Sequence, residues 1–109
     1  MFNRDYDVKM RTPIGARYGT MSVSIENNKI KGVLVILKKS NPFSGNIDEN
    51  GDCSIKGKVT TLMRTIPYHA TGRITKEKMD LQLKSEHEIF DLSGTASAHV
   101  PTIKKEESI

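Results

Sequence analysis

The sequence has no tryptophan, a single cysteine and no long apolar run, and each shortage excludes a class of protein. No stretch reaches the roughly 18 consecutive apolar residues of a membrane-spanning helix, so we expect no membrane span. Cys53 stands alone, which excludes an intrachain disulfide and agrees with a reducing compartment. Because the N-terminal residues show no apolar segment with a small-residue cleavage site, we expect no signal peptide and a cytoplasmic location.

The sequence also has little helical periodicity and only a small excess of positive charge. Apolar residues do not recur with a helical period over any window of adequate length, so little or no helix is expected. The 17 basic and 13 acidic residues give a net charge of +4 and are mixed along the chain. That balance favours solubility and gives only slight support for an acidic partner.

The dominant pattern is alternation of apolar and polar residues with a period of two. It predicts about eight strands, each with one apolar face, around residues 6–10, 19–25, 30–36, 43–47, 53–59, 66–74, 79–83 and 90–96. Short polar loops separate them, with Asn27-Asn28 and Asn50-Gly51 as hairpin signals and residues 38–42 as a looser link. Short loops between successive strands predict antiparallel pairing in an up-and-down meander. We expect one domain over residues 1–98 and a polar tail over residues 99–109.

Glycine recurs in the centres of the predicted strands. Each of Gly32, Gly45, Gly57, Gly72 and Gly94 lies two residues from an apolar side chain, so it shares that inward face. Inward glycines permit sharp coiling where a β-carbon would clash. The chain is therefore predicted to be all-β, forming a small barrel that is either closed or half-open.

This order of strands with apolar–polar–glycine centres, over residues 6–98, resembles the lipocalin-like (calycin) barrels and the compact bacterial barrels of unassigned function. The resemblance implies an up-and-down barrel fold. Because the chain has no tryptophan, it has no Gly-x-Trp signature, and no binding residue is carried over from the family.

The predicted interior carries little chemistry. Its only polar atoms are expected to be the hydroxyls of Tyr6 and Tyr68 and the Cys53 thiol, with no carboxylate pair, histidine–carboxylate pair or basic group pointing inward. We therefore expect no catalytic residues, no enzyme activity and no cofactor. No metal site is expected either, because neighbours in Glu86-His87-Glu88 point in opposite directions and residues 48–52 do not match a calcium loop.

Three hypotheses for function remain. The first is a binding module for a small apolar or mixed ligand, with a lining of Tyr6, Met10, Met21, Leu34, Tyr68 and Phe90. The second is a structural protein that forms a homo-oligomer through an outward apolar strip of Val33, Val35 and Leu37, unless the tail, with Val100 and Ile103, covers that strip. The third is nucleic-acid binding through Lys31, Lys56 and Lys58, which the inward placement of most aromatic residues disfavours.

Overall fold

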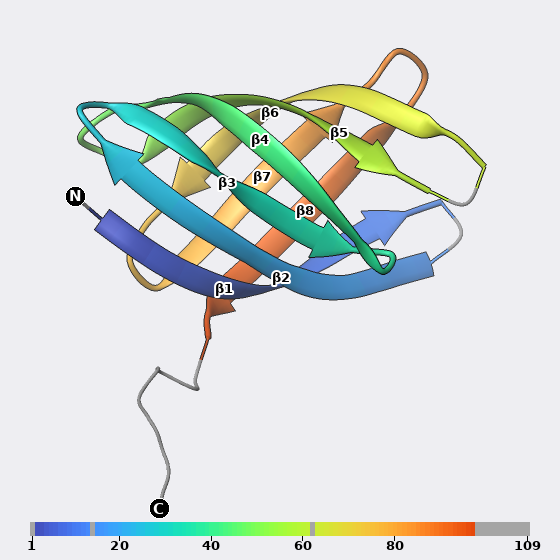
Figure 1. The fold of residues 1–109 in the computed structure, drawn as a ribbon, viewed down its shortest axis with the longest axis horizontal. Coiled ribbons are helices and arrows are strands. Elements are labelled where there is room, and N and C mark those ends of the chain that lie inside the picture. Colours follow the sequence, from blue (N-terminus) through green and yellow to red (C-terminus); the bar gives the residue numbers. More distant parts are fainter. Residues whose placement is uncertain (1, 14, 62, 98–109) are drawn as a thin grey trace, which may run out of the picture.

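The computed structural model describes residues 2–13, 15–61 and 63–97. Within them the chain forms eight strands and no helix, as predicted (Figure 1). The strands are β1 (Phe2–Thr12), β2 (Gly15–Glu26), β3 (Lys29–Ile36), β4 (Lys39–Ile47), β5 (Asp52–Thr60), β6 (Thr65–Ile74), β7 (Lys78–Lys84) and β8 (Ile89–Ala96). The described residues thus include no helix of the length and apolarity that a membrane crossing requires. The predicted tail, residues 99–109, lies outside the described residues, as do Val100 and Ile103.

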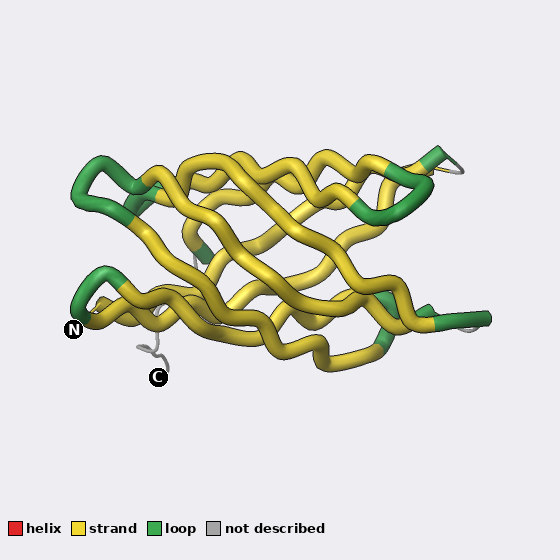
Figure 2. Tube along the Cα trace, turned by 90° about the horizontal axis from the view of Figure 1, so that it is seen from above, coloured by secondary structure: helices red, strands yellow, loops and turns green. Residues whose placement is uncertain are grey.

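The strands form one closed barrel. Each strand pairs antiparallel with the next, and β1 also pairs with β8, so that no strand edge is left open. Figure 2 shows the strands winding obliquely around the barrel, with the loops confined to its two ends. The predicted meander is confirmed, and of the two predicted shapes the closed one is correct.

The inward face of the strands forms the core, and the glycines lie within it as predicted. Along one row of paired residues, Gly32 faces Phe43, Phe43 faces Gly57 and Gly57 faces Tyr68. Glycine and aromatic residues alternate, so each ring fills the space that its glycine neighbours leave. A β-carbon added at Gly45 would collide with the Ser54 carbonyl oxygen of β5. The glycines therefore permit the close approach of neighbouring backbones that a narrow barrel requires.

The link between β3 and β4 differs from the loose connection that the sequence predicts. Ile36 pairs directly with Lys39, so Leu37 and Lys38 form a two-residue hairpin turn with φ values of 56° and 64°. Such a turn favours asparagine and glycine, which is why Leu-Lys gives no signal in the sequence. Pro42 lies inside β4 rather than at its start, and the pairing of β4 with β5 begins only at Phe43.

At one end of the barrel, hydrogen bonds join the connections to neighbouring strands, and we call it the closed end (Figure 1, left). The Asn28 carbonyl accepts a hydrogen bond from the Ile47 amide at 3.0 Å, and the Gly51 carbonyl accepts one from Ile74 at 2.9 Å. The Tyr6 hydroxyl donates to the Thr75 carbonyl from inside the barrel. These bonds join the β2–β3, β4–β5 and β6–β7 connections to neighbouring strands, so this end has little freedom to open.

The opposite end, which we call the mouth, is surrounded by the other four connections: β1–β2, β3–β4, β5–β6 and β7–β8 (Figure 1, right). The β5–β6 and β7–β8 connections are joined here by an ion pair between Arg64 and Glu88. The meander places alternate turns at opposite ends, so these four segments, far apart in sequence, surround one opening.

Candidate functional site

A hollow of about 770 Å³ lies at the mouth of the barrel and receives residues from all four surrounding connections. Its apolar lining consists of Met10, Pro13, Leu37, Val59, Met63, Ile66 and Phe90. Its charged lining consists of Arg17, Lys38, Lys39, Arg64 and Glu88. The volume falls within the range of roughly 300–1,000 Å³ that is usual for small-molecule sites.

The floor of the hollow is the upper layer of the core. Met10 on β1 and Phe90 on β8 are both buried, and Val59 and Ile66 face each other at the end of the β5–β6 pair. Leu37 reaches the hollow because positive φ turns it back onto the core, against which it packs half-buried. The four floor residues are only 2–8% exposed, so most of the apolar surface open to an entering molecule belongs to the residues around them, such as Leu37 and Met63.

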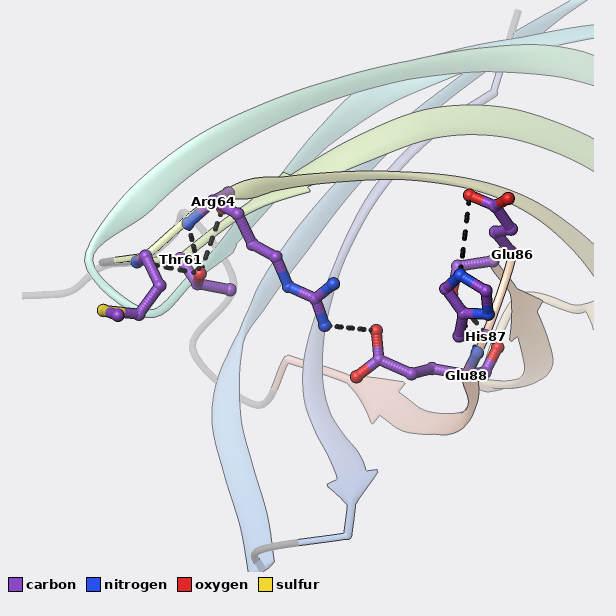
Figure 3. A network of polar contacts seen from close by, with 7 residues as sticks. Thr61, Arg64, Glu86, His87 and Glu88 are labelled. Carbon is purple, nitrogen blue, oxygen red and sulfur yellow. Dashed lines mark hydrogen bonds and ion pairs between the residues drawn. The ribbon is translucent and has the colours of Figure 1, made fainter.

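Hydroxyl groups fix the turns around the mouth. The Thr61 hydroxyl accepts hydrogen bonds from the amides of Met63 and Arg64 and donates one to the Arg64 carbonyl. In the β7–β8 turn the Ser85 hydroxyl makes the same kind of bonds with the backbone of Glu88. Figure 3 shows Arg64 extending from the β5–β6 turn to Glu88 in the β7–β8 turn, and its Nη2 lies 2.6 Å from the Glu88 Oε1.

Two of the six predicted ligand-lining residues, Met10 and Phe90, line the hollow. The other four, Tyr6, Met21, Leu34 and Tyr68, lie deeper in the packed core. Sequence reasoning missed Leu37, Val59, Ile66 and the charged rim as parts of this site. Val59 and Ile66 continue the alternating pattern, but that pattern does not tell which end of a strand opens to solvent.

The interior contains the three predicted polar residues, all of them buried. Burial raises the pKa of Tyr68 to about 12. It also raises the pKa of the Cys53 thiol to about 11, with the Asp52 and Asp48 carboxylates contributing. Cys53 is therefore protonated at neutral pH and lacks the thiolate that a nucleophile requires.

The interior also contains polar groups that the sequence reading did not predict. Asn41 is 2% exposed, and its side chain bonds the Leu34 carbonyl and the Thr60 amide. The prediction that no basic group points inward was wrong: Arg4 and Arg17 share the inward register, opposite Val23 and Met10. Both are half-buried near strand ends, where a long apolar stem can cover the core. The Arg4 Nε is itself buried and has no hydrogen-bond partner among the described residues.

The predicted outward strip on β3 is shorter than expected. Val35 is 39% exposed and Val33 is half-buried, and both lie on the outer face of the barrel. Leu37 was expected there as well, but the tight turn places it against the core at the mouth. The outer apolar surface is instead extended by Pro42, which pairs with Val33.

The three lysines considered for nucleic-acid binding are exposed on the outer wall. Lys31 and Lys56 are both register partners of Ser44, on either side of it, and Lys58 follows on β5. His69 is the next partner of Lys56, and its Nε2 lies 2.7 Å from the Ser54 hydroxyl. These side chains form a basic row across β3, β4, β5 and β6.

Among the described residues, no three histidine, cysteine, aspartate or glutamate side chains converge in a way that could hold a metal ion. His87 lies 3.8 Å from its neighbour Glu86, while Glu88 turns to Arg64. The Asp48 carboxylate accepts hydrogen bonds from the amides of Asn50 and Asp52, so it stabilises the β4–β5 turn. These acidic residues have structural partners within the barrel.

The comparisons with known proteins support the fold. No family model matches the chain, and no curated protein matches its sequence. A solved structure titled "De novo design of a fluorescence-activating beta barrel" is similar, with a TM-score of 0.60 at 10% sequence identity. The similarity covers 88% of this chain and 94% of that one. A lipocalin-like fold is compatible with this architecture, and at this identity the likeness concerns the fold alone.

Proposed function

We propose that this chain is a non-catalytic binding module that takes a small apolar molecule into the hollow at its mouth. The observation that carries the proposal is the apolar floor of that hollow, formed by Met10, Val59, Ile66 and Phe90 beneath an opening of suitable size. The contrast between the two ends supports it, because at the closed end hydrogen bonds join the connections to neighbouring strands.

Met63 also supports the proposal that the hollow binds a small apolar molecule. It lines the hollow and the residue is 90% exposed, so little of it is packed against the rest of the barrel. A methionine side chain is flexible and adapts to irregular apolar surfaces. Met63 is therefore well placed to fold over a bound molecule and to become buried on binding.

The proposal is tested with Nile red, a neutral dye whose emission rises and shifts to the blue in apolar surroundings. The similar designed barrel is described as fluorescence-activating, which makes a dye a reasonable first probe. We expect saturable binding, weakened about fivefold or more by Met63→Glu, since a charge placed at the apolar opening costs roughly 1 kcal/mol or more.

Ile89→Glu is the matched control, because Ile89 is 60% exposed at the same end of the barrel but does not line the hollow. Its affinity for the dye should equal that of the unmodified chain. Absence of any saturable fluorescence change, or an equal loss of affinity in both variants, contradicts the proposed site.

Self-association is a second candidate function, favoured by the outer apolar surface of Val33, Val35 and Pro42. Val33 and Pro42 are paired neighbours, and Val35 continues the same face of β3. A strand that is apolar on both faces is usually covered on both sides. This surface would let two barrels pack side by side.

Val35→Lys should convert an assembly of barrels into monomers while leaving the fold intact, because it places a charge in the proposed contact without touching the core. Size-exclusion chromatography with light scattering measures the mass, and circular dichroism checks the fold. Lys31→Ala, on the same face of β3, serves as the control and should keep the mass of the unmodified chain. An identical mass for Val35→Lys and the unmodified chain would rule this assembly out.

A further inference from the structure

The rim of the hollow is strongly cationic, although its floor is apolar. Four cationic side chains, Arg17, Lys38, Lys39 and Arg64, line it with one carboxylate, that of Glu88, which gives a formal charge of 4 − 1 = +3. The whole chain has a net charge of only +4. The positive charge of the rim surrounds an apolar opening, where it raises the local concentration of anions.

The rim cations differ in how far they are already paired. Arg64 is paired with Glu88, so it contributes little free charge. Among the described residues, Lys38 and Lys39 form no ion pair with a carboxylate. Arg17 lies on the inward register opposite Met10, and its Nη1 donates only to the carbonyl of Ala16, at 3.1 Å. Arg17 therefore contributes a planar, permanently charged donor to the lining of the hollow, with its Nη1 beside the start of β2.

The β3–β4 turn, which forms part of this rim, contains residues that are unfavourable for its backbone shape. Two-residue hairpin turns with both φ values positive favour asparagine and glycine, and the β2–β3 turn at the closed end uses Asn27 and Asn28. At the mouth the same backbone shape is made by Leu37 and Lys38, which adopt positive φ only under strain. The strained residues are the ones that line the hollow, one contributing apolar surface and the other charge.

We infer that the ligand is an amphiphilic monoanion: an apolar body with one carboxylate or other anionic group at its end. The apolar body lies on Met10 and Phe90, and the anionic group meets Arg17, with Lys38 and Lys39 nearby. Arginine binds a carboxylate through two parallel hydrogen bonds, which fixes the orientation of the ligand as well as its affinity. This inference rests on the proposed function, because it specifies the ligand of the same hollow.

The test measures displacement of Nile red by three ligands with the same chain: decanoate, decanol and decyltrimethylammonium. We expect decanoate to bind about tenfold more tightly than decanol, with the cationic ligand weakest, and the preference to shrink at high salt. In Arg17→Gln the preference for decanoate should fall to about twofold or less, with the affinity for decanol unchanged. Arg73→Gln, an equal loss of charge on the outer wall, should keep the preference.

A second variant makes the test independent of any role of Arg17 in folding. Lys38→Gly relieves the strain at Lys38 and leaves the packing of Leu37 in place, so the barrel should melt at no lower temperature while its affinity for decanoate falls. Equal affinities of the unmodified chain for decanoate and decanol overturn the inference and leave the proposed function standing. If neither Nile red nor any of the three ligands binds, both the proposed function and the inference fall.

Discussion

Gly45→Ala should lower the free energy of unfolding by about 3 kcal/mol, even though it adds a single methyl group. All three nearest atoms to the new β-carbon belong to the backbone of β5, including the Ser54 carbonyl oxygen and, at 2.8 Å, the Ile55 Cα. Backbone in a paired strand cannot move aside without disturbing the hydrogen bonds on both of its edges. Urea unfolding monitored by circular dichroism measures the loss.

Gly57→Ala provides the comparison, because its β-carbon meets a side chain instead of the backbone. The nearest atoms are the Tyr68 hydroxyl oxygen at 2.6 Å and its Cζ at 2.9 Å. A ring can rotate or shift, so this variant should lose only about 1 kcal/mol. A double-mutant cycle with Tyr68→Leu should show coupling for Gly57 and none for Gly45. Equal losses for the two glycines would contradict the assignment of the obstacle to the backbone at Gly45.

Asn41→Leu should lower the free energy of unfolding by about 2–4 kcal/mol, although leucine has a similar size and greater hydrophobicity. The Asn41 Oδ1 accepts a hydrogen bond from the Thr60 amide at 3.0 Å, and its Nδ2 donates to the Leu34 carbonyl at 3.0 Å. The pairing of β4 with β5 begins at Phe43, so Asn41 replaces the backbone bonds that are missing beyond it. Leucine would leave a buried donor and a buried acceptor without these partners.

Hydrogen exchange of the Thr60 amide adds a local measurement to the unfolding curve. Its exchange should accelerate in Asn41→Leu more than that of amides at the closed end, such as Ile74. Ser40→Leu is the matched control, since Ser40 is an exposed neighbour on β4, and its stability should stay within about 0.5 kcal/mol of the unmodified chain. A stable Asn41→Leu variant with a protected Thr60 amide would show that the side chain is dispensable.

The strands were predictable from the sequence because each has one apolar face with a period of two. A half-buried sheet imposes that period on every strand, and the inward glycines follow the same rule. The closure of the barrel could not be predicted in the same way, since the alternation within β1 and β8 is equally compatible with a half-open sheet. The pairing of Met10 with Leu92 joins two strands whose individual patterns do not specify each other.

The candidate site was much less predictable, for three physical reasons. It combines four turns that are far apart in sequence, and the meander order alone does not tell which end stays open. Arg17 faces inward at a strand end, where the alternation rule weakens because a long side chain can reach solvent from either face. Leu37 lies in a turn whose residues are unfavourable for its backbone shape, so the sequence suggests a loose link there.

The pairing of β1 with β8, which we call the seam, affects how the chain folds during synthesis. Each of the other pairings joins neighbours in sequence, whereas the hydrogen bond from the Ser97 hydroxyl to Asp7 spans 90 residues. During synthesis the first seven strands emerge before their last partner exists, so β1 and β7 are both exposed edges until β8 follows. Joining such distant segments also carries the largest loop-closure entropy among the pairings, so we expect the seam to form last. The nascent barrel is thus most vulnerable to wrong partners just before its final strand arrives.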